Sequence, residues 1–449
     1  MNGAESYYRA TAPGESYAAL AGRQHARICV IGAGFAGLAT AMSLMEHGER
    51  DVVLLEAERI GHGASGRNGG FVFGGYSLDE QALLATVGAE QGRRLYQLTL
   101  GAVDQIRRRI ERYGIDCDAT HGGIYLANWF DDARVLDQRQ RFMREQLGVE
   151  WQRVSPADFA ERARSERYFG ALYEENAFHF HPLKYAQGLA RALREGGVRV
   201  HEGSRVSAIA AQPRQPDTTG GRASPGWRVS TAGGEVLCDE VVVCCGGYIE
   251  RLYPALAGAI LPIATYVMVT EPLGQRMPQA LATDAAVYDT RFAFDYYRPL
   301  QDSRMLWGGR ISIRSRSAQD VARLLYADML KVYPQLAGTR VDYAWSGLMS
   351  YGRHKMPQLG RLPNGVWYGM GFGGHGVGPT SLAGDVLSAA LMGELSKVEQ
   401  FAAWGLPTTG GAAGLLAAQL TYWYYELRDW MRGQGRSPRP QAGGSEMAN

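Results

Sequence analysis

Three glycines near the start of the chain have the spacing of a dinucleotide-binding turn. Gly32, Gly34 and Gly37 form the pattern G-x-G-x-x-G, and the acid Glu56 follows 19 positions after the last of them. In this pattern the first glycine permits a tight turn, the second lets a pyrophosphate approach the backbone, and the third lets a helix pack closely on a strand. The amides at the helix start then face the phosphates, and Glu56 can accept hydrogen bonds from a ribose. An acid at this place disfavours a 2′-phosphate, because the two anions would repel each other.

The elements that must position these residues are also visible in the sequence. Residues 28–31 form a continuous apolar run that predicts a buried strand. Apolar residues then recur at helical spacing from Leu38 to Met45, and Gly48 ends this predicted helix. A second apolar strand, 52–55, ends directly before the acid. The complete βαβ unit supports a dinucleotide site much better than the glycine pattern alone.

A second glycine-dense segment follows the βαβ unit. It reads G-A-S-G-R-N-G-G from Gly63 to Gly70 and is too irregular for a helix or a strand. The backbone amides of such a segment can lie along the face and edge of a flat ring, and the alternative interpretation is a mobile loop. A long helical region is predicted after it, from about Ser77 to Tyr113.

Composition and charge exclude several other classes of protein. Glycine accounts for 58 of 449 residues and shows no collagen-like period. Lys and Arg number 47 against 45 Asp and Glu, which gives no argument for nucleic acid as a partner. Five cysteines without a C-x-x-C pair or zinc-like histidine spacing predict a reduced, cytoplasmic protein without a metal site. We expect neither a signal peptide nor a membrane span, because no apolar run reaches about 18 residues.

The motifs together resemble the D-amino-acid-oxidase-like (DAO) superfamily of FAD-dependent amine oxidoreductases, and within it the gamma-glutamylputrescine oxidoreductase branch. The resemblance extends from about Ser6 to Met431, and its most specific motifs are G-A-S-G-R-N-G-G and the late G-H-G-V. It implies an α/β fold in which a doubly wound Rossmann-type FAD-binding domain is interleaved with an α+β substrate domain on a mixed sheet. FAD would lie where the two domains meet.

Predicted αβ units at the start, middle and end of the chain agree with such an interleaved order. We expect the FAD-binding domain to combine residues 26–75, 178–250 and 352–398, and the substrate domain to combine residues 76–177 and 251–351. Residues 399–433 are expected to form a C-terminal helical segment that packs on the flavin domain or on a second subunit. The alternative for this amphipathic segment is a marginal affinity for membranes. Residues 434–449 are polar and rich in Gly and Pro, which predicts a disordered tail.

The resemblance implies a set of cofactor-binding residues at matching positions. They are expected to contact the pyrophosphate, the adenosine, the flavin ring and its pyrimidine end, with the backbone of Val206 at the adenine. The set comprises Gly32, Gly34, Phe35, Ala36, Gly37, Glu56, Ala57, Gly63, Ala64, Ser65, Arg67, Asn68, Gly69, Val206, Gly246, Gly373, Gly374, His375, Gly376 and Val377.

The family's D-Y-Y-R and G-H-G-V motifs imply three catalytic residues, Tyr297, Arg298 and His375. His375 could instead be an ordinary turn histidine. We also expect an aromatic wall suited to an ammonium or a methylene chain, although aromatic residues on alternating strands are equally typical of a core. The expected wall comprises Tyr288, Phe294, Tyr296, Tyr297, Trp307, Trp345 and Tyr351.

Three departures from relatives refine the expected chemistry. Met349 stands where free amino-acid oxidases carry a carboxylate-binding arginine, although Arg353 lies four residues later. Ser350 and Tyr351 offer no cysteine for a covalent flavin, so FAD is expected to bind noncovalently. The strand that reads M-L-W-G-G-R lacks the oxygen-activating lysine of sarcosine oxidases, which leaves oxygen or another electron acceptor open.

The predicted function is therefore an FAD-dependent amine oxidoreductase of polyamine catabolism. The substrate would be a small amine, either a gamma-glutamylated polyamine or a similar omega-amino compound, and the carbon beside its amine would be oxidised by hydride transfer to flavin. One alternative is an oxidase of a cyclic secondary amino acid such as proline or pipecolate. The other is a flavin-binding protein without turnover. The oligomeric state is left open.

Overall fold

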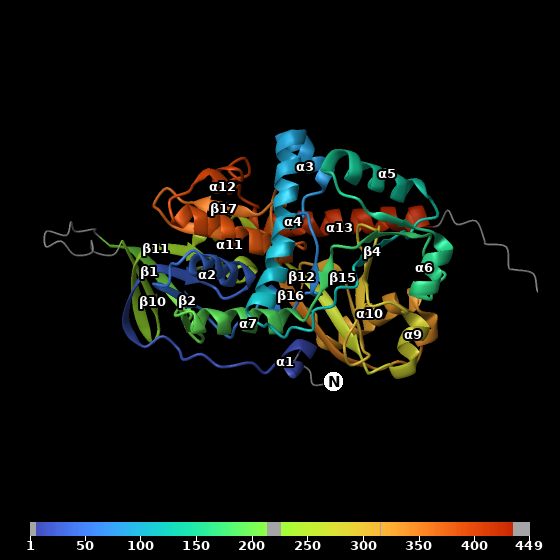
Figure 1. Ribbon diagram of the computed structural model, residues 1–449, viewed down its shortest axis with the longest axis horizontal. Helices are drawn as coiled ribbons and strands as arrows, with labels where there is room; N and C mark the ends of the chain where they lie inside the picture. The colour runs from blue at the N-terminus through green and yellow to red at the C-terminus, as the bar shows by residue number, and fades with distance from the viewer. Residues whose placement is uncertain (1–5, 213–225, 315, 434–449) are drawn as a thin grey trace, which may run out of the picture.

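The computed structural model describes residues 6–212, 226–314 and 316–433. The tail predicted to be disordered, 434–449, lies outside these residues. Two large sheets dominate the structure. The long helix α4 (Ala89–Arg112) runs between the helices that cover one sheet and those that cover the other (Figure 1). Within the described ranges, no helix combines the length and apolar character that spanning a bilayer requires.

The first sheet has a parallel centre in the order β18-β11-β1-β2-β8, and the antiparallel strands β17, β10 and β9 extend it. Residues Ile28–Ile31 of β1 pair with both β2 and β11, so the predicted strand is the middle of the sheet. Its strands are β1 (Gly22–Ile31), β2 (Val52–Leu55), β8 (Arg199–His201), β9 (Val206–Ala211), β10 (Trp227–Thr231), β11 (Gly234–Val243), β17 (Gln358–Arg361) and β18 (Trp367–Met370).

Helices α2 (Phe35–Glu46), α7 (Pro182–Glu195) and α11 (Val377–Leu391) cover one face of this sheet together with α4. Nearly every side chain of α2 is buried, because α2 is packed between the strands and its helical neighbours α7 and α11. Gly48 follows its C-terminus with φ 92°, as the sequence predicted for a helix end. The other face packs against the antiparallel strands β9 and β10.

The second sheet is mixed, with the order β16-β12-β15-β14-β13-β4-β6-β5 and one parallel pair, β13 with β4. Helix α10 (Ala318–Val332) packs on one face and buries a second core. The α/β fold class with a mixed second sheet is thereby confirmed. Its strands are β4 (Ile124–Ala127), β5 (Gln152–Val154), β6 (Ala171–Glu174), β12 (Ile260–Thr270), β13 (Ala286–Asp289), β14 (Tyr296–Pro299), β15 (Met305–Ser312) and β16 (Val341–Gly352).

The remaining elements connect or flank the two sheets. The helical region predicted from Ser77 to Tyr113 is two helices, because Gly88 adopts φ 84° and separates α3 from α4. These elements are α1 (Tyr7–Thr11), β3 (Phe71–Val72), α3 (Glu80–Val87), α5 (Arg134–Phe142), α6 (Pro156–Ala163), β7 (Phe178–His179), α8 (Pro254–Ala257), α9 (Met277–Ala280), α12 (Ser396–Glu399) and α13 (Gly411–Gly433).

Candidate active site

A cavity of about 1560 Å³ lies between the two sheets. Its lining combines the ends of β1 and β2 in the first sheet with residues of β12, β15 and β16 in the second. Every residue for which the sequence predicted cofactor binding lines this cavity, with the exception of Gly37. The structure thus brings together segments as distant as 32–36 and 373–377. No cluster of His, Cys, Asp or Glu in the described part of the chain is arranged to hold a metal ion.

The turn between β1 and α2 has no room for side chains. Gly32 has φ 100°, and a Cβ there would lie 2.9 Å from the carbonyl oxygen of Cys244. A Cβ on Gly37 would overlap the carbonyl oxygen of Gly32, which explains why Gly37 supports the turn from outside the cavity. Helix α2 begins without a side-chain cap on Gly34, and the Phe35 amide donates to Ser65 Oγ at 2.8 Å. The open helix start is the kind of site that a pyrophosphate occupies.

Glu56 stands at the end of β2, beside this turn. Its carboxylate accepts hydrogen bonds from the backbone amides of Ala33 at 2.8 Å and Glu58 at 3.0 Å. Burial raises the pKa of the Glu56 carboxyl, and the two amide donors oppose that effect. The carboxylate is held in one orientation on the cavity wall, near Val206 of β9. This is the geometry expected for binding an adenosine ribose.

Replacing Glu56 by alanine is expected to weaken FAD binding at least tenfold, or by about 1.4 kcal/mol, because a charged acceptor for the ribose is lost. The dissociation constant is measured from quenching of FAD fluorescence by the apoprotein. Glu235→Ala is the matched control, since Glu235 pairs with Arg23 and Arg228 on the same sheet and lies outside the cavity lining. Equal FAD affinity in Glu56→Ala and the control would contradict the assigned role.

The segment from Gly63 to Gly70 is a hydrogen-bonded loop with a short 3-10 turn, Ala64–Gly66. Asn68 donates to the carbonyl oxygens of Ala64 and Ser65 and accepts from the Gly70 amide at 2.8 Å. Arg67 donates to carbonyl oxygens before and beyond the loop, on His62 and Ser346. The two side chains therefore fix the loop shape and leave its backbone facing the cavity.

Two of the residues predicted to be catalytic, Tyr297 and Arg298, do not line the cavity. Tyr297 is buried against α10, where its ring stacks on Trp307 at 4.4 Å and its hydroxyl lies 3.2 Å from that of Tyr168. Successive residues of a strand point to opposite faces, so its neighbour Tyr296 faces the cavity instead. Trp307 belongs to the same core as Tyr297, and Trp345 also lies outside the lining.

Arg298 is 2 % exposed. It contacts the glycine loop, residues 63–70, from the side that faces away from the cavity. Its guanidinium donates to the carbonyl oxygens of Gly69 at 2.7 Å and Phe180 at 2.8 Å, and to the Tyr8 hydroxyl at 3.2 Å. The Tyr8 hydroxyl in turn donates to the carbonyl oxygen of Asn68. Arg298 is thus a positioning residue for the glycine loop.

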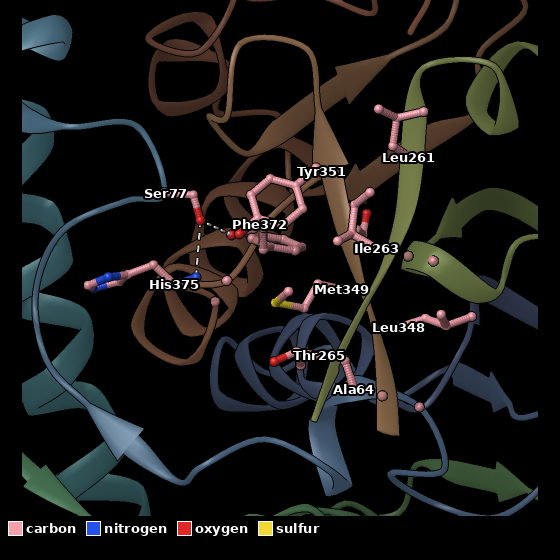
Figure 2. Close-up of a pocket in the computed structure, with 18 of the residues that line it drawn as sticks. Ala64, Ser77, Leu261, Ile263, Thr265, Leu348, Met349, Tyr351, Phe372 and His375 are labelled. Atoms are coloured by element: carbon pink, nitrogen blue, oxygen red, sulfur yellow. Dashed lines mark hydrogen bonds between the residues drawn. The ribbon is translucent and has the colours of Figure 1, made fainter. Parts of the chain in front are cut away.

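His375 lies at the cavity edge just before α11, but its ring is already engaged. Its Nε2 lies 2.8 Å from the carbonyl oxygen of Gly74, and the ring meets that of Phe73 at 4.1 Å. Because a carbonyl can only accept, Nε2 carries the proton. Burial lowers the pKa of the imidazole, so it is neutral. Figure 2 shows the ring directed away from Met349 and Tyr351.

The centre of the cavity is apolar and aromatic (Figure 2). Met349 and Tyr351 project from β16 toward the Gly373–Gly374 turn, and Tyr351 is partly buried. None of the ten residues labelled in Figure 2 is an acid, a lysine or an arginine. A substrate lying beside these residues would meet methyl groups, rings and hydroxyls. Charged side chains, among them Arg67, Arg353 and Lys355, also line the cavity.

Sequence reasoning missed an acid–base cluster, of which Glu80 and Arg139 line the cavity and Glu174 does not. Arg139 donates to both carboxylate oxygens of Glu80, at 2.6 and 2.9 Å. Glu174 lies close enough to both for their charges to affect it, and burial raises its pKa to about 8. These residues come from α3, α5 and β6, so no local sequence pattern could have indicated their meeting.

Glu174 predicts a specific pH dependence of stability. Its folded pKa of about 8 exceeds the usual 4.5, so the folded state holds the proton more tightly than the unfolded state. The resulting stabilisation is complete below the unfolded pKa and is lost as pH rises toward 8. Replacing Glu174 by glutamine is expected to flatten this decline, so that the difference in unfolding free energy between the variant and wild type changes by about 3.5 kcal/mol between pH 5 and 8. Urea unfolding at both pH values measures it, and parallel curves for the two proteins would contradict it.

Comparison with known proteins agrees with this geometry. Residues 27–390 match the family described as FAD dependent oxidoreductase (DAO). The chain belongs to this family of FAD-dependent oxidoreductases. The glycine cradle fits the cofactor, since added Cβ atoms at Gly32 and Gly63 would meet the cavity walls at 2.9 Å. The resemblance inferred from the motifs is confirmed, and with it an FAD-dependent oxidoreductase acting on small amine compounds.

The chain is 37 % identical over 410 residues to gamma-glutamylputrescine oxidoreductase of Escherichia coli, covering 90 % of this chain and 92 % of the relative. It is 31 % identical over 419 residues to the probable oxidoreductase OrdL of Haemophilus influenzae, covering 91 % and 93 %. Among solved structures, glycine oxidase from Bacillus cereus superimposes with a TM-score of 0.67 at 18 % identity, covering 85 % of this chain and 98 % of that one. This last likeness concerns the fold.

Proposed function

We propose that the protein oxidises an amine of a gamma-glutamylated polyamine or a similar omega-amino compound, using noncovalently bound FAD. The observation that carries the proposal is the apolar and aromatic lining around Met349, which suits an alkyl amine better than a free amino-acid carboxylate. The 37 % identity with gamma-glutamylputrescine oxidoreductase supports the same substrate class. FAD supplies the chemistry by accepting a hydride from the carbon beside the amine, and the imine product hydrolyses to an aldehyde.

Residues of this chain would hold FAD in an extended conformation along the cavity. The start of α2 would bind the pyrophosphate, Glu56 the ribose, and the backbones of 63–70 and 373–377 the flavin ring. The start of α11 carries no side-chain cap, and its positive dipole end would stabilise negative charge on the reduced ring. Cys244 lies beside Gly32, at the proposed pyrophosphate end, which supports noncovalent binding of the ring.

The wall residues would also prepare the substrate amine. Hydride loss requires a neutral amine, and an apolar environment favours the neutral form of an ammonium group. Tyr288, Phe294, Tyr296 and Tyr351 line the cavity and would pack along the methylene chain. Water is displaced from these surfaces when the methylene chain of the substrate binds. The rings therefore would position the carbon and favour the neutral form of the amine.

We further propose that the first sheet and its helices form an FAD-binding domain of residues 26–75, 178–250 and 352–398. Residues 76–177 and 251–351 would form the substrate domain, which supplies β12, β15 and β16 to the cavity wall. The five cysteines are free thiols, which supports the proposal of a cytoplasmic location.

Anaerobic mixing with a panel of amines tests the substrate. We expect gamma-glutamylputrescine to bleach the flavin absorbance, and a panel without any bleaching amine would overturn the proposal. A second candidate, oxidation of a cyclic secondary amino acid, is favoured by one observation: Arg353 lines the cavity and could bind a carboxylate. Bleaching by pipecolate or proline alone would select that candidate. Admission of air after bleaching distinguishes oxygen from another electron acceptor by the rate of reoxidation.

A further inference from the structure

Helix α13 exposes a broad apolar face. Seven of the eleven large apolar side chains that are exposed in the described chain lie on this one helix, with exposed fractions from 53 to 62 %. An ordinary surface helix turns such residues inward. The seven are Leu416, Leu420, Trp423, Tyr424, Leu427, Trp430 and Met431.

The opposite face of α13 is fixed to the substrate side of the protein. The Gln419 side-chain oxygen accepts from the Ile313 amide at 3.1 Å, and Asp429 accepts from the Phe292 amide at 2.7 Å. Arg310 donates to Glu426 at 3.4 Å. These contacts hold the polar residues inward, so the helix cannot rotate to bury its apolar face. Figure 1 shows α13 as one long helix over the second sheet.

The composition of the exposed face favours a lipid surface over a second copy of the chain. The seven residues span an arc of about 120° at 100° per residue, wider than a coiled-coil seam. Two tryptophans and a tyrosine among them are the residues enriched at bilayer interfaces. Arg428 borders the face, is exposed and makes no ion pair among the described residues. The face itself carries no acid, so a second copy would offer Arg428 no carboxylate there.

We propose that α13 docks the protein on an anionic bilayer, with its apolar face in the interface and Arg428 at the lipid phosphates. The helix would lie in the plane of the membrane and would not cross it. Ala417, Ala418 and Tyr422 on its other side line the cavity, so the docked surface would lie directly behind the site. This proposal is independent of the identity of the substrate.

The test uses the full-length holoenzyme and phosphatidylcholine vesicles with or without phosphatidylglycerol, separated by flotation. We expect wild type to float with the anionic vesicles. The variant Leu420→Ser/Trp423→Ser/Leu427→Ser should lose at least tenfold of its bound fraction, and these three residues lie outside the cavity lining. Arg428→Glu should weaken binding about tenfold on the anionic vesicles alone, because a cation near lipid phosphate is replaced by an anion.

Matched controls separate this docking from other effects. Met392→Ser/Leu395→Ser removes two exposed apolar side chains that lie outside α13, each 47 % exposed. This variant should float like wild type. FAD content and circular dichroism report folding, and Arg428→Glu keeps the test valid if the triple variant does not fold. Wild type that fails to float, or that floats no better than both α13 variants, would overturn the proposal. A dimer in light scattering that the triple variant converts to monomer, without vesicle binding, would assign the face to a second copy.

Discussion

Protein carrying Gly37→Ala should leave purification without FAD. The new Cβ would overlap the Gly32 carbonyl oxygen, so α2 must move away from the turn at the end of β1. The carbonyl oxygen is part of the backbone, so it cannot move out of the way as the end of a flexible side chain could. We expect the unfolding free energy to fall by about 3 kcal/mol and the open helix start to lose its alignment with the pyrophosphate.

The ratio of flavin to protein absorbance after gel filtration and urea unfolding measure these two effects. Gly101→Ala is the matched control, because Gly101 lies inside α4 with open space around its Cβ position. That variant should bind FAD normally and gain about 0.5–1 kcal/mol of stability from the helix propensity of alanine. Stoichiometric FAD in Gly37→Ala would show that the turn does not depend on this close packing.

The second large effect is expected at Arg298. Replacing it by methionine leaves the carbonyl oxygens of Gly69 and Phe180 and the Tyr8 hydroxyl without their buried donor. Each unsatisfied buried acceptor costs about 1–3 kcal/mol, so we expect a total loss of about 3–5 kcal/mol of stability. The glycine loop would lose its support, and FAD affinity should fall at least a hundredfold, or about 2.7 kcal/mol.

The same variant distinguishes positioning from catalysis. A positioning role predicts that kcat, measured at saturating FAD, stays within a few-fold of wild type while the FAD dissociation constant rises. Arg298→Lys should recover part of the affinity, because an ammonium can still donate to some of the three oxygens. Arg340→Met removes a surface arginine whose side chain is 70 % exposed and should leave the stability close to that of wild type. Normal FAD affinity with a collapsed kcat in Arg298→Met would instead favour contact with the substrate.

The βαβ unit around Gly32 was predicted from the sequence because its signals are local. A strand, a tight turn and a helix follow each other within 30 residues, and each leaves its own pattern of apolar residues and glycines. The same holds for the glycine loop, whose shape is fixed by the side chains of Arg67 and Asn68 within it. The two helices α3 and α4 were predicted as one, because the apolar pattern continues across Gly88.

The sequence could not place a residue whose role depends on which face of a strand it occupies. Tyr296 and Tyr297 are adjacent and chemically alike, and only the packing of α10 on one face of the second sheet places Tyr297 in the core. Arg298 points to the cavity side but ends beneath the glycine loop, where three acceptors from distant segments surround it. Period-two alternation distinguishes two faces without indicating which one meets the cavity.

By itself the sequence determined the fold class, the cofactor family and the glycine-rich segments that line the cavity, since these depend on short segments whose conformation is encoded locally. The tertiary structure alone decided that Glu174 meets Glu80 and Arg139, which line the cavity, and that α13 keeps its apolar face outward. Contacts between segments far apart in the chain follow from how sheets and helices pack together, and no local pattern records them.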